Sequence, residues 1–120
     1  MKVEIRVTNN FSKRAKALIK KYPSLINELE ELEKNLINNP KLGTPLGSYS
    51  YKIRVSIKSK GKGKSGGARV ISHVDGEIIG TVDRNEEGQT TVYLLTIYDK
   101  SETESISSKE LKELIKNKNW

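Results

Sequence analysis

The sequence contains no cysteine and a single histidine, His73. Disulfides, thiolate metal sites and cysteine nucleophiles are therefore excluded, and one imidazole cannot build a histidine-rich metal site. No apolar run approaches the roughly 20 residues that a membrane-spanning helix needs. The first four residues lack the apolar stretch of a signal peptide. These absences predict a cytoplasmic protein with no bound metal and no membrane partner.

The composition fits one small globular domain. Of the 120 residues, 34% are hydrophobic and 31% are charged, which is enough apolar material for one compact core. A chain of this length leaves no room for a second domain. We therefore expect a single domain over residues 1–120.

Acidic residues are missing from one stretch of an otherwise balanced chain. The 22 basic and 15 acidic residues give a formal charge of +7, and residues 51–70 hold seven of the basic residues and none of the acidic ones. The remaining 15 basic and 15 acidic residues cancel. An excess confined to one segment favours a site for a polyanion over a general role in solubility.

Apolar spacing predicts the secondary structure of the first half of the chain. The expected elements are a strand over residues 2–8, a helix from an N-cap at Asn9 or Asn10 to Tyr22, a helix from an N-cap at Ser24 to Pro40, and a loop over residues 40–50. The two helices carry apolar stripes at helical spacing, so we expect them to pair as an antiparallel hairpin.

The second half reads as three strands and a helix. Strands are expected over residues 51–57, 68–74 and 92–98, and the third is apolar on both faces, with Val92 and Leu94 on one side and Tyr93, Leu95 and Ile97 on the other. Two positions remain open for the turn before that strand, Asp75-Gly76 or residues 83–88, and we favour the second, as the end of a long ribbon. Ser107 and Glu110 form a capping box, flanked by a hydrophobic staple of Ile106 and Leu111.

The order strand, helix, helix, three strands, helix predicts an α+β fold. We expect a small, twisted, mainly antiparallel sheet with the N-terminal helical hairpin on one face, and a C-terminal helix.

The strongest candidate site is the segment from Lys58 to Arg69. Lysines recur at every second position through Lys64, separated by serine or glycine. Glycines let the backbone approach phosphates, and lysines supply the opposite charge. The segment is either a nucleic-acid contact or a solvated basic loop, and it does not fit the frame of a Walker loop. Arg69 opens the following strand, so its guanidinium should be better ordered than the loop lysines.

Two motifs in this order resemble the RelE/HigB-type toxins of bacterial type II toxin–antitoxin modules. The first motif is Gly-Lys-Gly-Lys-Ser-Gly-Gly-Ala-Arg-Val-Ile over residues 61–71, and the second is Leu-Leu-Thr-Ile-Tyr-Asp-Lys-Ser-Glu over residues 94–102. The two helices ahead of the basic strand fit as well. The resemblance covers nearly the whole chain except residues 75–90.

The resemblance implies a ribosome-dependent endoribonuclease that cuts mRNA in the ribosomal A site and needs no metal or cofactor. It also implies a cognate antitoxin, often with a helix-turn-helix domain, and the ribosome and mRNA as partners. The family's two loop lysines fall on Lys60 and Lys62, and its strand arginine falls on Arg69. A second family arginine falls near Lys100 or on Ser101, and a family tyrosine falls on Ser107, so both of those residues are absent here.

The site residues predicted on this basis form two groups. The catalytic candidates are Lys60, Lys62, Arg69, Tyr98 and Lys100, with Tyr98 and Lys100 replacing the absent tyrosine and arginine. The RNA-binding candidates are Lys52, Arg54, Lys58 and Lys64. In an extended chain, Tyr98 and Lys100 would share one strand face. His73 is expected to be structural.

Three functions stay open from the sequence. The first is the ribosome-dependent mRNA endoribonuclease. The second is a ParE-like use of the same fold, which poisons DNA gyrase through protein contacts. The third is a non-catalytic RNA-binding protein. The concentrated basic segment favours the first and third, and the resemblance favours the first.

Overall fold

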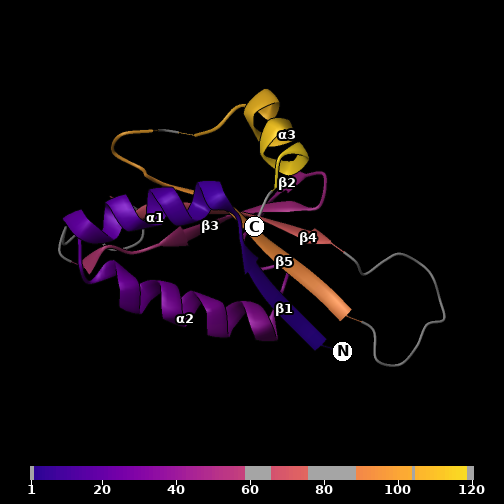
Figure 1. Ribbon diagram of the computed structural model, residues 1–120, viewed down its shortest axis with the longest axis horizontal. Helices are drawn as coiled ribbons and strands as arrows, with labels where there is room; N and C mark the ends of the chain where they lie inside the picture. Colours follow the sequence, from indigo (N-terminus) through magenta and orange to yellow (C-terminus); the bar gives the residue numbers. More distant parts are fainter. Residues whose placement is uncertain (1, 59–65, 76–88, 104, 119–120) are drawn as a thin grey trace.

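The computed structural model describes residues 2–58, 66–75, 89–103 and 105–118. The elements in chain order are β1 (Lys2–Val7), α1 (Asn9–Lys21), α2 (Leu25–Asn38), β2 (Thr44–Gly47), β3 (Ser50–Val55), β4 (Ala68–Asp75), β5 (Gln89–Asp99) and α3 (Ser108–Lys116) (Figure 1). The predicted α+β class is confirmed, because within the described residues three helices pack on one five-stranded sheet.

The strands lie in the order β1-β5-β4-β3-β2. Only β1 and β5 pair in parallel, and the other three pairs of described strands are antiparallel, so the prediction of a mainly antiparallel sheet is confirmed. Strand β2 was expected to be loop because of Pro45 and its flanking glycines. It lies at the edge of the sheet, where a proline need not donate a ladder hydrogen bond.

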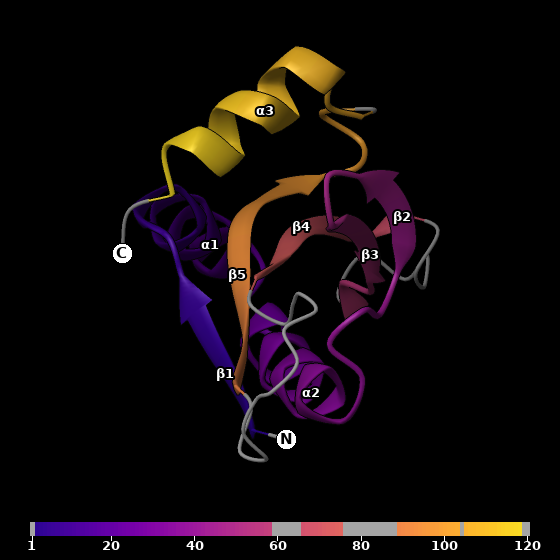
Figure 2. The ribbon, with the colours of Figure 1, turned by 90° about the vertical axis from the view of Figure 1, so that its right-hand side faces the viewer.

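The helices α1 and α2 cover one face of the sheet, as predicted for the N-terminal hairpin (Figure 2). The N-cap of α1 is Thr8, one residue before the two predicted asparagines. Its hydroxyl accepts the Phe11 N–H at 3.1 Å and lies 3.1 and 3.0 Å from the carbonyl oxygens of Leu94 and Leu95. Ser24 occupies the N-cap position of α2 but makes no side-chain capping bond.

We call the face under α1 and α2 the helix face. Its core is apolar and includes Phe11, Leu25, Leu32, Leu36, Ile53, Val55, Val70, Val92, Leu94 and Ile97. A second, smaller cluster lies on the opposite face, where Leu111 of α3 packs with Ile71, Leu95 and Tyr98. Helix α3 therefore covers only part of that face, with the sheet between it and the other two helices (Figure 2).

A register shift in β5 changes which side chains share a face. Ile71 pairs with Thr96 while Ser72 pairs with Leu94, so Leu95 is the extra residue of a β-bulge. Ile97 consequently packs with Leu94 in the core of the helix face, and Tyr98 packs with Leu95 on the opposite face. The strict alternation predicted for this strand, with Ile97 on the side of Leu95, is wrong for this reason.

The predicted start of α3 is confirmed. The Ser107 hydroxyl accepts the Glu110 N–H at 3.1 Å, and the Ser107 N–H donates to the Glu110 carboxylate at 2.9 Å. Ile106 packs in the same small cluster as Leu111, as the hydrophobic staple requires. The helix is thereby fixed at its N-terminus above the sheet.

Two predictions fall on residues that the structure does not describe. The lysine-rich part of the basic loop lies in residues 59–65, and the favoured turn lies in residues 76–88. Among the helices that are described, none has both the length and the apolar character that crossing a bilayer requires.

Candidate functional site

A row of three side chains crosses the face opposite to the helix face. Arg54 of β3 pairs with Arg69 of β4, and Arg69 pairs with Tyr98 of β5. Directly opposed residues on neighbouring strands project from the same face, with Cβ atoms about 5 Å apart. We call the surface formed by Lys52, Arg54, Arg69 and Tyr98 the basic face.

Arg69 is the fixed centre of this row. Its side chain is only 4% exposed, and Nη1 donates to the Ala68 carbonyl oxygen at 3.1 Å. Burial lowers the pKa of Arg69, the neighbouring Arg54 lowers it further, and Tyr98 acts against both. The two arginines lie side by side in the row, so an anion above it would be stabilised by both of them.

Tyr98 is equally buried, at 4% exposure, and its hydroxyl has no hydrogen-bond partner among the described residues. Burial raises the pKa of Tyr98, while Arg69 acts in the opposite direction. The phenol therefore keeps its proton at neutral pH. A protonated phenol beside a guanidinium can donate a hydrogen bond or a proton to an oxygen of a bound anion.

The other predicted residues are only partly brought together with this row. Lys52 is half-buried and lines a small cavity with Leu46 of β2 and Leu111 of α3. Lys58 was predicted as an RNA-binding residue together with Lys52 and Arg54, but β3 ends at Val55, before Lys58. Lys58 instead lies 3.5 Å from a carboxylate oxygen of Glu28 on α2. Lys60, Lys62 and Lys64 lie outside the described residues.

Lys100 does not extend the strand face of Tyr98, contrary to the prediction. The Asp99 carboxylate accepts the N–H and the hydroxyl of Ser101 at 2.9 and 2.8 Å, which turns the chain after β5. The Lys100 N–H donates to the Gly67 carbonyl at 3.0 Å. Lys100 is thereby joined at its backbone to the end of the basic segment. A side chain at Gly67 would collide with the Val55 carbonyl, so this close approach requires glycine.

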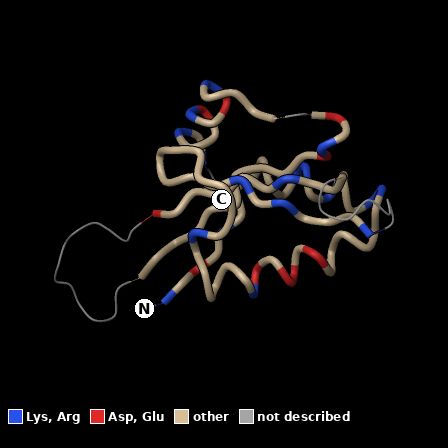
Figure 3. Tube along the Cα trace, turned by 180° about the vertical axis from the view of Figure 1, so that it is seen from behind, with Lys and Arg blue, Asp and Glu red and all other residues tan. Residues whose placement is uncertain are grey.

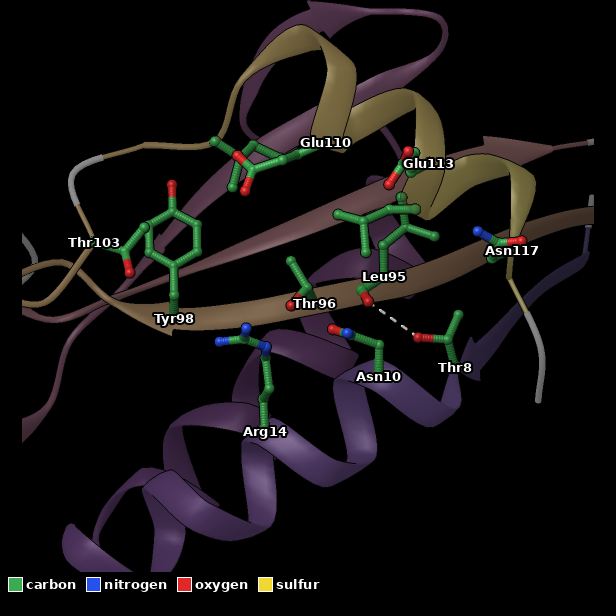
Figure 4. Close-up of a pocket in the computed structure, with 12 residues that line it drawn as sticks. Thr8, Asn10, Arg14, Leu95, Thr96, Tyr98, Thr103, Glu110, Glu113 and Asn117 are labelled. Carbon is green, nitrogen blue, oxygen red and sulfur yellow. Dashed lines mark hydrogen bonds between the residues drawn. The ribbon is translucent and has the colours of Figure 1, made fainter.

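A polar cavity lies on the other side of Tyr98. It has a volume of about 380 Å³ and is bounded by α1, β5 and α3. Its lining residues include Thr8, Asn10, Arg14, Thr96, Tyr98, Thr103, Glu110, Glu113 and Asn117. Figure 4 shows the ring of Tyr98 rising from β5 toward α3, with the two glutamates reaching down from α3 and Arg14 reaching up from α1. The ring of Tyr98 therefore belongs to both the basic face and the cavity.

Charge is distributed unevenly over the molecule. The acidic residues Glu28, Glu30, Glu31 and Glu33 all belong to α2, one of the two helices that cover the helix face (Figure 3). The described arginines of the row lie on the opposite side of the sheet. A polyanion is therefore repelled by α2 and attracted both to the basic face and to α1, which carries five basic residues and no acidic one.

His73 lies apart from the row. Its Nδ1 is 3.3 Å from the Ser50 hydroxyl, which supports the structural role predicted for it. In the described ranges, no three side chains from histidine, aspartate and glutamate converge as a metal site would require. No family model matches the chain, and no curated protein matches it either.

Sequence reasoning missed two features of this site. Arg54 was predicted as one of several RNA-binding cations, but its place directly opposite Arg69 was not predicted, because that pairing depends on the register of two strands. Sequence reasoning also missed the cavity, whose residues come from three separate elements. The local sequence signal for the cavity was Glu110, but the role of this residue had been attributed to helix capping alone.

Proposed function

We propose that this protein is a RelE/HigB-type toxin of a type II toxin–antitoxin module, acting as a ribosome-dependent endoribonuclease on mRNA. The observation that carries the proposal is the cross-strand row of Arg54, Arg69 and Tyr98. Two guanidinium groups and a protonated phenol on one sheet face suit a phosphodiester whose charge increases during reaction. The resemblance of the two sequence motifs supports the same activity.

The proposed reaction uses the RNA as its own nucleophile. The 2′-hydroxyl passes its proton to solvent as its oxygen attacks the adjacent phosphorus, the bond to the 5′-oxygen of the next nucleotide breaks, and a 2′,3′-cyclic phosphate remains. The five-coordinate phosphorus carries extra negative charge, which Arg69 stabilises from a fixed position and Arg54 from an exposed one.

Tyr98 is the proposed proton donor to the departing 5′-oxygen. Because the pKa of Tyr98 is raised, the phenol stays protonated until it donates its proton to the departing 5′-oxygen. The resemblance assigns catalytic roles to Lys60 and Lys62, and Lys100 adds a cation at the end of β5. Lys52 is proposed to bind phosphate without taking part in proton transfer.

The proposed partners follow from the same resemblance. They are the ribosome with its mRNA and a cognate antitoxin, often of the helix-turn-helix type, in the cytoplasm. We expect the antitoxin to cover the basic face or to displace α3. Its binding should change hydrogen exchange over the described residues 66–69 or over α3.

The decisive experiment measures single-turnover cleavage of mRNA on ribosomes saturated with the protein. Arg69→Ala should lower the rate by about 10²–10³ and leave ribosome binding nearly unchanged, because a preorganised donor acts mainly on the transition state. Arg69→Lys should restore only part of the rate, since an ammonium cannot make a two-pronged contact. The matched control is Arg6→Ala, which removes an arginine from the edge strand β1, where its side chain lies 2.8 Å from the Glu4 carboxylate.

The alternatives give different results in this assay. A non-catalytic RNA-binding protein would bind ribosomes and leave mRNA 5′ ends unchanged. A gyrase poison would leave mRNA intact and cause DNA damage in cells. Normal cleavage by Arg69→Ala on saturated ribosomes, with the variant folded, would reject the assignment of Arg69 as a catalytic residue.

A further inference from the structure

We propose, resting on the function above, that the cavity between α1, β5 and α3 is a nucleobase pocket. It takes the base beside the cleaved phosphate and favours a base that carries an exocyclic amino group over uracil. The glutamates of α3 accept hydrogen bonds from the amino group, and the ring of Tyr98 is the wall between the pocket and the phosphate.

The size and position of the cavity fit this role. Its volume of about 380 Å³ lies in the range of small-molecule sites and accommodates one base with a few water molecules. Tyr98 belongs to the row with Arg69 and also lines the cavity. Neighbouring strands are about 4.8 Å apart, so a phosphate above Arg69 and a base beyond Tyr98 are within reach of one nucleotide.

The wall of the pocket carries an unpartnered polar group. The side chain of Tyr98 is 4% exposed, and within the part of the chain that the structure describes its hydroxyl has no hydrogen-bond partner. Burying a hydroxyl without a partner costs free energy, which is regained when a ligand supplies one.

The charges around the cavity favour a base inside it and a phosphate outside it. Its lining includes two carboxylates, Glu110 and Glu113, and one guanidinium, that of Arg14. The net charge of these three groups is negative, so a phosphate is disfavoured inside the cavity and is favoured over Arg54 and Arg69. A neutral base with hydrogen-bond donors is therefore the part of a nucleotide that suits the cavity.

The polar groups also select among bases. A carboxylate only accepts hydrogen bonds, so Glu113 can pair with the amino group of cytosine, adenine or guanine. Uracil presents a carbonyl oxygen where cytosine has its amino group, and two acceptors would then face each other. Arg14, Asn10 and Asn117 supply donors for the remaining acceptors of the base.

Glu113 is the glutamate on which selection should depend. The carboxylate of Glu110 already accepts the Ser107 N–H at 2.9 Å as part of the capping box, so replacing Glu110 would also weaken α3. No such capping bond involves the Glu113 carboxylate, and the residue is exposed in the last half of the helix. A substitution at Glu113 should therefore test the pocket without unfolding its wall.

The experiment measures binding of short single-stranded RNAs that cannot be cleaved, because a 2′-deoxy residue replaces the attacking nucleotide. Cytosine and uracil have the same size and differ at the amino position, so hexanucleotides of uracil with and without one cytosine form the matched pair. The wild-type protein should bind the cytosine-containing RNA about tenfold more tightly, as one good contact to a base edge allows.

Three variants sharpen the result. Glu113→Gln, which can present either an amide oxygen or an amide N–H, should reduce the preference to about twofold or less. Glu113→Lys should raise the affinity for both RNAs and favour the uracil form. Glu31→Gln on α2 removes the same charge far from the cavity and should leave the preference at its wild-type value.

The outcomes separate this inference from the function on which it rests. Equal binding of both RNAs by the wild-type protein, or an unchanged preference in Glu113→Gln, would overturn the pocket even if the protein cleaves mRNA. Weakened binding of the antitoxin alone in Glu113→Gln would show that the cavity holds a protein side chain, and would also overturn it. A Glu113-dependent preference without any cleavage would support the pocket and reject the nuclease.

Discussion

The two faces of the sheet use neighbouring residues for opposite purposes. Val70 and Ile97 pair across β4 and β5 and are fully buried in the apolar core under α1 and α2. Arg69 and Tyr98, each one residue away in the chain, pair on the other face beside a polar cavity. One face is closed by two helices, and the other is covered only in part by α3 (Figure 2).

This difference separates stability from activity along the same two strands. The helix face gains its free energy from buried apolar area, which is insensitive to the order of charges on the surface. The basic face holds two adjacent cations and a buried hydroxyl that meets no hydrogen-bond partner in the described ranges, and both features cost stability. Groups that cost stability while being held in place are typical of a site that acts on a ligand.

Replacing Ile97 by alanine should give the largest loss of stability. The side chain is fully buried, and truncation of a buried isoleucine costs about 2–5 kcal/mol. Urea unfolding at neutral pH measures this, and cleavage per folded molecule should stay at the wild-type rate. Arg54→Ala, an exposed residue of the basic face, should change stability by no more than about 0.5 kcal/mol. Similar losses for both variants would contradict the division between the two faces.

Tyr98→Phe should have the reverse effect of the change at Ile97. Removing the proposed proton donor should slow cleavage by about 10²-fold, the lower end for general acid catalysis. The unfolding free energy should be equal or higher, because the buried hydroxyl has no partner to lose. Burial raises the pKa of this phenol, so the wild-type rate should not fall between about pH 7 and 9 through its deprotonation. A normal rate in Tyr98→Phe would remove the phenol from the mechanism.

Ser107→Ala should destabilise α3, the helix that partly covers the basic face. It removes one half of the capping box of α3, which costs about 1 kcal/mol. Hydrogen exchange should become faster in the amides of α3 while those of β4 and β5 keep their protection. Ser108→Ala, at the next position, is the matched control because its hydroxyl is not the capping group. Equal protection of α3 in the two variants would show that the staple and the small core hold it without the cap.

The sequence was sufficient for the parts of the fold that local patterns determine. The capping box of α3, the apolar stripe of α2 and the four longer strands each have a short-range signal, and all were placed to within a few residues. The strand β2 was missed because Pro45 argues against a strand anywhere except at an edge, and edges are known only once the sheet is assembled.

The geometry of the candidate site depends on a feature with no local signal. Leu95 and Thr96 give no sequence mark of a bulge, yet the bulge moves Ile97 to the helix face and Tyr98 to the face of Arg69. Identifying Arg69 and Tyr98 as candidates was possible from their residue types and neighbours. Their pairing, and that of Arg69 with Arg54, follows from strand register, which long-range packing decides.

The smallest expected effect concerns His73, another titratable side chain of β4 on the face of Arg69. Burial lowers the pKa of His73 from its usual 6.5, and Lys118 lowers it further, while Asp75 and a hydrogen bond with the Ser48 backbone act in the opposite direction. A histidine whose folded pKa is depressed binds a proton more readily in the unfolded chain. Stability should therefore fall as the pH drops below about 6.5, and be recovered above it. The loss is measured as the difference between the unfolding free energies at pH 7.5 and pH 5.5. The carboxylates contribute equally to this difference in the wild type and in His73→Gln. The loss should be smaller in His73→Gln by the share due to the imidazole. The same loss in both proteins would mean that His73 titrates as it does in the unfolded chain, and that this end of the face is open to water.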